Sequence, residues 1–507
     1  MQHKEPATLL QRLDTVLRIG LASRTDLADD GAKSPVWFGR RGRVPREGGD
    51  VRSANTDPVI VENALARYDE QVRGAFAEMQ RNSSAVGGND VGRHLPAPGP
   101  ALSAYLAASD IAVADLGEYH GRRLRLLDLM RNPRTRTTKT FPSLLIVARA
   151  AEHVRRTGER VMIVTPSSGN KATALRDAVL TAHRTGLATP DEVSIMVVVP
   201  AASWGKMWAS PLDEDDAARH ANPVAVYPGA DTDRVKALAR SMVDRCAADL
   251  REKHGVRLWY TLDLANYRVA DTVRALVEHD HLPAAEARLH VHAVSSAFGL
   301  LGHDLGVRRL AAAGHTPTPP RYLLVQHLDT ADMVLSLRFG STAREAMPTY
   351  RFDARTGHYH QDDDPRFPAV TASVTERLDP TFYTRNPTTS PEMNALIGKQ
   401  GGDGIVVSRY ECLHRYPALR EMLAPTGYML PAEPADLREW SLVMALTGIL
   451  NAIDRDLVHE PDVLVHGSGS YGVADFTPIP PEHVHTAADV DDLATIVYAA
   501  LEREAVR

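Results

Sequence analysis

Short apolar runs alternate with helix-like segments along the chain from Leu124 to about residue 329. VMIVTP (161–166) and VSIMVVVP (193–200) are rich in β-branched and other apolar residues, a composition that favours buried strands. Strands that alternate with helices over such a length predict a parallel sheet with helices on both faces. We therefore expect an α/β fold built on mostly parallel sheets.

The same patterns predict the other elements of the chain. Strands are expected at 124–129, 161–166, 193–200, 257–263, 288–294, 321–329 and 462–469. Helices are expected at 1–28, 59–80, 142–157, 172–185, 232–254, 269–280, 300–314, 409–424 and 435–457. Loops are expected at 29–58 and 87–100, and residues 338–400 show no regular pattern.

Several broad classes of protein are excluded by composition. The net charge of −6 over 507 residues gives no reason to expect a nucleic-acid partner, and the arginine-rich segment 40–52 is best explained as a solvated loop. Only two cysteines occur, Cys246 and Cys412, which argues against a disulfide framework or a cysteine zinc site. No apolar run is long enough to span a membrane, and the N-terminus lacks a signal peptide. We expect a cytoplasmic protein.

Small polar residues follow four of the predicted strands, in the turns at 165–170, 227–231, 294–299 and 466–472. Ligands of open α/β sheets bind beyond the carboxyl ends of strands, where helix N-termini attract anions. Ser167-Ser-Gly-Asn170 and Ser295-Ser-Ala-Phe-Gly299 therefore have two interpretations: anion-binding turns, or ordinary helix caps.

Lys139 ends the segment RNPRTRTTK (131–139), just before a predicted helix. The positive end of a helix repels a cation, so a lysine is unexpected there on structural grounds alone. A special amine and a solvated basic loop both remain open at this point.

Taken in order, these segments resemble the fold type II pyridoxal-phosphate (PLP) enzymes, the family of tryptophan synthase β, cysteine synthase and threonine synthase. The resemblance covers roughly 115–315 and 400–475. Its motifs are an Asn-Pro…Lys segment ending at Lys139, the SSGN turn, a small-residue turn before GLLGHDLG (299–306), and the late HGSGSYG segment (466–472). It implies two open twisted sheets flanked by helices.

The resemblance also implies a set of site residues. Lys139 would hold PLP as a Schiff base and act as the catalytic base. The substrate and the cofactor hydroxyl would contact Thr138, Ser167, Ser168, Gly169 and Asn170. The cofactor phosphate would contact the backbone of Ser295, Ser296, Ala297, Phe298 and Gly299, and the pyridine nitrogen would contact Ser468, with Ser470 as second choice.

The domains implied by the resemblance are an N-terminal helical and loop extension (1–110), a large cofactor domain (111–160 and 255–480, with an insertion at 320–400), a smaller substrate domain (161–254), and a C-terminal helix (481–507). The implied reaction is elimination or replacement, at Cβ or Cγ, on an amino acid in specialised biosynthesis. PLP would act as the electron sink, with Arg134 and Arg136 lowering the pKa of Lys139. The family relation also implies a homodimer.

The chain departs from the family at three places. Lys139 lies one residue further from Asn-Pro than usual, Lys171 replaces a small residue after SSGN, and Ala297-Phe298 replace glycines. A catalytically silent relative that binds a ligand or a partner is therefore a second hypothesis.

Two further hypotheses are weaker. A nucleotide-dependent enzyme would need a glycine-rich loop on an early strand, and HGSGSYG is followed by prolines that prevent the required helix. A metal site could use His290 and His292, which share one face of a strand, but a structural role is preferred, and no metal site is predicted. Glu411, Tyr267 and Arg268 are weaker candidates for contacts with the site.

Overall fold

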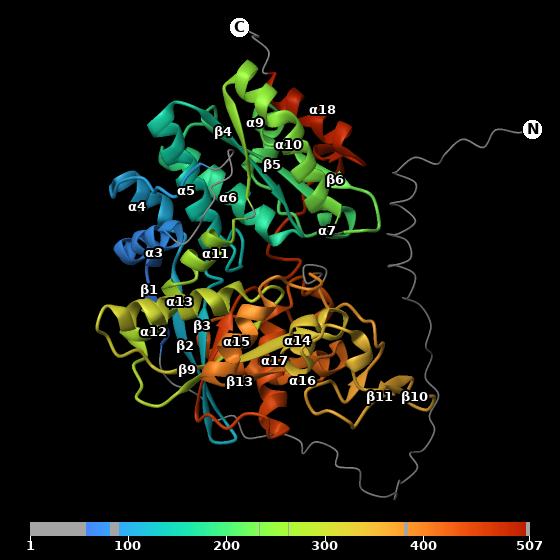
Figure 1. Ribbon diagram of the computed structural model, residues 1–507. Coiled ribbons are helices and arrows are strands. Elements are labelled where there is room, and N and C mark those ends of the chain that lie inside the picture. The colour runs from blue at the N-terminus through green and yellow to red at the C-terminus, as the bar shows by residue number, and fades with distance from the viewer. Residues whose placement is uncertain (1–56, 82–90, 233, 262, 380–383, 503–507) are drawn as a thin grey trace, which may run out of the picture. The chain divides into compact units, whose positions relative to one another are not determined.

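Two sheets organise the chain in the computed structural model (Figure 1), which describes residues 57–81, 91–232, 234–261, 263–379 and 384–502. The predicted helix at 1–28, nearly all of the predicted loop at 29–58 and the arginine-rich segment lie outside the described residues. No helix in the described part of the chain combines the length and apolarity that a bilayer-spanning segment needs.

The first sheet has five parallel strands in the order β15-β6-β5-β4-β7. Their bounds are β4 (Arg160–Pro166), β5 (Val193–Pro200), β6 (Val224–Tyr227), β7 (Val256–Tyr260) and β15 (His485–Thr486). Helices α5 (Thr140–Thr157) and α6 (Asn170–Thr185) pack on one face, and α10 (Arg234–His254) and α18 (Val490–Leu501) pack on the other. Because both faces are covered, the inner strands β4, β5 and β6 are mostly apolar.

The second sheet has seven strands in the order β1-β2-β3-β14-β8-β9-β13. Their bounds are β1 (Val59–Val61), β2 (Ile111–Tyr119), β3 (Arg122–Asp128), β8 (Arg288–Ala293), β9 (Pro320–His327), β13 (Gly402–Val407) and β14 (Asp462–Gly467). The pairs β1–β2 and β2–β3 are antiparallel, and the other four pairs are parallel.

Helices cover both faces of this sheet. Helices α16 (Arg409–Leu423) and α17 (Ser441–Asp454) pack on one face, and the opposite face contacts α12 (Val273–His281), α13 (Phe298–Ala312), α14 (Asp332–Phe339) and α15 (Ser390–Gln400). The remaining helices are α2 (Ala64–Arg67), α3 (Asp69–Arg81), α4 (Pro100–Leu106), α7 (Ala201–Trp204), α8 (Pro211–Glu214), α9 (Asp216–Ala221) and α11 (Leu264–Ala270).

Glycines on α13 allow it to lie unusually close to the junction of α11 and α12. A Cβ added at Gly302 would lie 2.3 Å from the Asp271 Cβ, and one at Gly306 would lie 2.7 Å from the Thr272 carbonyl oxygen. No side chain fits at either position, so the GLLGHDLG motif determines how closely these helices pack.

The expected architecture of mostly parallel sheets flanked by helices is confirmed. Several details of the sequence interpretation differ, and strands β2, β6 and β13 were not predicted. The predicted helix at 59–80 begins instead with β1, because Val59–Val61 pair with β2 at the edge of the sheet. The boundary expected at residue 254 would assign β7 to the large domain, whereas β7 pairs with β4. The irregular segment 338–400 contains β10 (Arg351–Asp353), β11 (His358–His360), β12 (Val370–Thr371) and α15.

Candidate active site

Lys139 occupies the N-cap position of α5, immediately after the turn that follows β3. Asn132 shapes this turn, because its carbonyl accepts the backbone N–H groups of Thr135 (3.2 Å) and Arg136 (2.8 Å). The Asn132 side chain also donates to Asp177 Oδ2 on α6 (2.9 Å). The Lys139 side chain is half-buried, with its amine 5.6 Å from the centre of the Tyr267 ring. The Asn-Pro turn therefore places the lysine at the start of α5, with its amine facing Tyr267 of α11.

The Lys139 amine lies in surroundings that disfavour its protonated form. Burial lowers the pKa of Lys139, and Arg274 lowers it further, against the opposing effects of the carboxylates of Asp271 and Glu439. The prediction that Arg134 and Arg136 supply the positive charge is wrong. Their guanidinium groups pair with Asp177 (2.5 Å) and Asp475 (3.0 Å) instead, since acidic partners lie next to both of them in the fold.

The SSGN turn begins α6, and its first serine acts as a cap. The Ser167 hydroxyl accepts the backbone N–H groups of Gly169 (3.1 Å) and Ala172 (3.0 Å). Gly169 has a φ of 122°, a conformation that glycine adopts without strain. Ser168 and Asn170 remain half-buried. The capping and ligand-binding interpretations therefore apply to different residues of the same turn.

Asn170 is held by residues that the sequence did not indicate. Its amide donates to Glu439 Oε2 (2.6 Å), and its carbonyl oxygen accepts the Tyr471 hydroxyl (2.8 Å). Glu439 also accepts the Lys206 amine (2.9 Å), which binds Asp379 at 2.9 Å as well. These buried charges come from segments far apart in the sequence, so no local motif could have revealed them.

The 295–299 turn keeps the backbone form of an anion-binding loop although glycines are replaced. Ala297 has a φ of 51°, which places it in the left-handed region before α13. The Phe298 ring stacks on Tyr267 with centroids 5.1 Å apart. Ser295 Oγ donates to Thr384 Oγ1 (3.1 Å), and the Ser296 carbonyl accepts the Thr389 hydroxyl (2.8 Å). Since Tyr267 also faces Lys139, this turn and the lysine lie close together.

Arg274 connects the lysine segment to this turn and was not predicted. Its guanidinium donates to Thr138 Oγ1 (3.0 Å) and Asp271 Oδ1 (2.6 Å), and it contacts His466 Nδ1 at 3.1 Å. A Cβ at Gly299 would lie 3.0 Å from the same guanidinium. The side chain is almost completely buried, so a permanent positive charge lies beside the first turn of α13.

The late HGSGSYG segment lies directly against the lysine segment. The Ser468 carbonyl accepts the Thr138 N–H (2.9 Å), the Ser470 N–H donates to the Arg136 carbonyl (3.2 Å), and Thr137 pairs with Gly469. Ser468 is half-buried, whereas Ser470 is fully buried and its hydroxyl has no partner among the described residues. Ser468 is therefore the serine of this segment that keeps accessible surface.

The chemistry of these groups fits PLP. An amine, an oriented amide, a left-handed turn beside an arginine, and a hydroxyl correspond to the aldehyde, phenolic oxygen, phosphate and ring nitrogen of that cofactor. The predicted residues with partial exposure are Lys139, Ser168, Asn170, Ser295, Ser296, Phe298, Gly299 and Ser468. The structure thus brings the predicted groups together and leaves each of these accessible.

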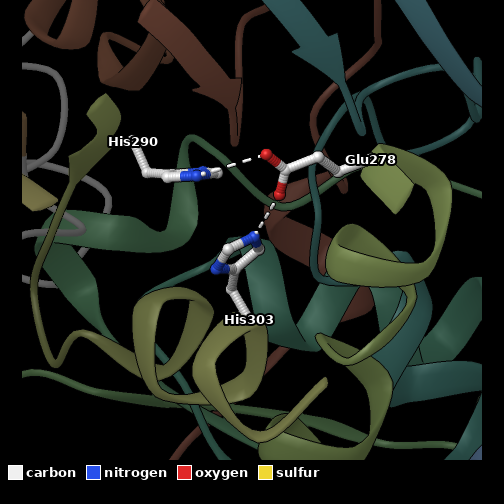
Figure 2. Close-up of side chains that lie close together, drawn as sticks. All are labelled: Glu278, His290 and His303. Carbon is white, nitrogen blue, oxygen red and sulfur yellow. Dashed lines mark hydrogen bonds and ion pairs between the residues drawn. The ribbon is translucent and has the colours of Figure 1, made fainter. Parts of the chain in front are cut away.

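A buried cluster of histidines lies behind this site, between the large sheet and α12 and α13. Figure 2 shows Glu278 between two of them, with its carboxylate 2.7 Å from His303 Nε2 and 3.4 Å from His290 Nε2. The three ligand atoms lie within 4.8 Å of one another, as a metal site would require. Arg288 already contacts the same carboxylate at 2.7 Å, and His466 contacts His290 Nδ1 at 3.0 Å. Arg288 and His303 already satisfy the Glu278 carboxylate, so a structural role explains this cluster.

Other candidates lie in ion pairs away from Lys139. Glu411 caps α16 through Ser408 and pairs with Arg455. Arg268 pairs with Glu392. Tyr267 is the one member of this group that contacts the site residues, through Lys139 and Phe298.

Comparison with known families identifies the chain's family. Residues 60–501 match the model of the "Family of unknown function (DUF6002)", and the chain belongs to that family. A search of curated protein sequences finds no match.

The solved structures that are similar to this chain include two threonine synthases and an ammonia-lyase. PLP-bound threonine synthase from Brucella melitensis is 11% identical, with a TM-score of 0.47 over 75% of this chain and 79% of that one. Threonine synthase from yeast is 12% identical, with a TM-score of 0.48 over 87% and 91%. An L-serine ammonia-lyase from Rhizomucor miehei is 15% identical, with a TM-score of 0.41 over 72% and 91%.

Proposed function

We propose that this chain is a PLP-dependent enzyme that performs elimination or replacement on an amino acid. The observation that carries the proposal is the position of Lys139. Its amine has a lowered pKa and lies beside the 295–299 turn, and the 468–470 segment pairs with the residues just before it. A lysine that acts as nucleophile and base needs a neutral amine, which a lowered pKa favours.

Each group has a role that follows from its chemistry. Lys139 would hold the cofactor through its amine, the 295–299 turn and Arg274 would bind the phosphate, and Ser468 would meet the ring nitrogen. Asn170, oriented by Glu439 and Tyr471, would contact the phenolic oxygen. The accessible donors of the SSGN turn would orient the substrate carboxylate.

When bound, PLP supplies an electron sink for the charge that develops at the substrate Cα. The free Lys139 amine would accept the Cα proton, and its lowered pKa favours the neutral form that this role needs. Loss of a leaving group from the substrate would complete an elimination. Tyr267 and Phe298 cover this region with an apolar surface and limit the access of water.

The test is a titration of the purified protein with PLP, followed by visible absorption. We expect a new band in the wild type that is lost in Lys139→Ala and kept in Lys171→Gln, which alters a second buried amine nearby. Borohydride reduction and peptide mass spectrometry should then place the cofactor on Lys139. No band in the wild type, or a label on Lys171, would refute the assignment.

A catalytically silent relative is the second candidate, and the 295–299 turn is the observation that favours it. Ala297 and Phe298 give the turn less room than glycines would. Binding of PLP without any spectral response to amino acids would support this alternative.

A further inference from the structure

Lys171 is a half-buried cation without an acidic partner in the part of the chain that the structure describes. It follows Asn170 in the first turn of α6, and its amine donates to the Thr261 carbonyl at 2.7 Å. None of the ion pairs among the described residues includes it. A neutral carbonyl compensates the charge of this half-buried amine only in part.

A nearby lysine that is buried shows what a structural lysine needs. Lys206 binds two carboxylates, those of Asp379 and Glu439, each at 2.9 Å. These charges raise the pKa of Lys206, against the effect of burial. Lys171 has none of this compensation, although the two side chains flank the same turn.

The charges near Lys171 are positive. Burial lowers the pKa of Lys171 to about 7, with further contributions from Lys139 and Lys236. The N-terminal end of α6 adds the positive end of a helix dipole. A negatively charged group beside Lys171 would be attracted by the N-terminus of α6 and by the three amines. It would also raise the pKa of Lys171 and so favour its protonated form.

Two buried hydroxyls at this end of the five-stranded sheet have no partner among the described residues. Thr165 and Thr261 are fully buried, and their Oγ1 atoms make no hydrogen bond. Thr165 lies in β4 and Thr261 directly follows β7, and they alternate with Ile163 and Trp259, which pack with α5 and α6. The Thr261 N–H donates to the Val164 carbonyl (3.1 Å), so the two threonines are neighbours on the face where Lys171 lies.

We propose that Lys171, Thr165 and Thr261 form a subsite for a second anionic group of the substrate. Resting on the proposed function, this names the substrate class: an amino acid whose side chain carries a carboxylate or a phosphate. The SSGN turn has separate accessible donors, which would bind the α-carboxylate of the substrate. The two anionic groups of the substrate would therefore contact different atoms of the protein. Lysine and hydroxyl groups together suit either anion.

The first test uses the PLP-loaded protein and the visible spectrum. L-serine, L-aspartate and O-phospho-L-serine are titrated into the wild type, Lys171→Gln and Lys171→Arg at matched ionic strength. We expect the wild type to respond to one of the doubly anionic compounds at a concentration about 10- to 100-fold lower than to serine. Lys171→Gln should lose this preference, and Lys171→Arg should retain most of it. The better of the two compounds distinguishes carboxylate from phosphate.

The second test does not depend on the cofactor. Thermal unfolding of the cofactor-free protein is measured with succinate and with butyrate, which differ in one carboxylate. We expect succinate to raise the melting temperature of the wild type more than butyrate does, and the two to be equal in Lys171→Gln. If the PLP band is absent but this difference is present, the proposed function fails and the subsite stands.

Three results would overturn the subsite. One is a wild type that responds equally to serine and to both doubly anionic amino acids. Another is a Lys171→Gln variant whose response to all three amino acids is weaker by the same factor, since Lys171 would then bind the α-carboxylate that they share. The third is an equal effect of succinate on the wild type and on Lys171→Gln.

Discussion

Replacing Glu278 by glutamine tests the buried network behind the site. The Glu278 carboxylate is 3% exposed and accepts Arg288 (2.7 Å) and His303 (2.7 Å). Burial alone would raise the pKa of Glu278, but His290, the hydrogen bond from His303 and the charge of Arg288 outweigh it and lower the pKa to about 2. Relative to the usual 4.5, this corresponds to a stabilisation of up to about 3 kcal/mol.

The sign of the pH dependence follows from the lowered pKa. The stabilisation is fully present above about pH 4.5 and is lost as the pH falls towards 2, because the unfolded state binds the proton first. In Glu278→Gln, His303 can exchange its tautomer and keep its bonds to Tyr322 and to the new amide, but Arg288 loses a charged partner. We therefore expect a loss of roughly 2–3 kcal/mol at pH 7.

Urea denaturation of both proteins between pH 3 and pH 8 measures this difference. It should be constant from pH 6 to 8 and shrink below pH 4.5. Glu286→Gln, the same exchange at an exposed position before β8, is the control and should have little effect. Equal stability of Glu278→Gln and the wild type at pH 7, or a difference that grows in acid, would refute the reasoning.

Two further substitutions test the packing around the site. Lys206→Met should destabilise the protein by about 3–5 kcal/mol, because it leaves Asp379 and Glu439 buried without their cation. Lys253→Met, at an exposed pair with Asp249, should have little effect in the same urea titration. Gly302→Ala should push α13 away from Asp271 at a cost of about 1–3 kcal/mol, and should weaken PLP binding by displacing Arg274. Gly398→Ala, which meets nothing within 4 Å, should be neutral or slightly stabilising, and a Gly302→Ala variant that matches it would contradict the close packing of α13.

Much of the candidate site could be predicted because its signals are local. Lys139 follows an Asn-Pro turn, and the SSGN and SSAFG turns each follow an apolar strand. Parallel strands bring their carboxyl ends to one edge of a sheet, so turns far apart in the sequence become neighbours without any further information.

The charged residues around these turns could not be predicted in the same way. Arg274 lies within an ordinary amphipathic helix, and Glu439 lies in a loop more than 260 residues from its partner Asn170. A buried charge has no signature in its own segment, since its environment is made by residues from elsewhere in the chain. For the same reason, Arg134 and Arg136 were wrongly assigned to Lys139.

The sequence by itself determined that apolar runs such as 161–166 and 193–200 become strands, because continuous apolar runs are stable only when both faces are covered. It also determined where the small polar turns fall. Only the tertiary structure decided that β7 joins the five-stranded sheet, that Val59–Val61 form a strand, and that Lys206 has two carboxylate partners whereas Lys171 has none among the described residues. Strand identity depends on local pattern, but pairing and charge compensation depend on contacts between distant segments, and those contacts exist only in the folded chain.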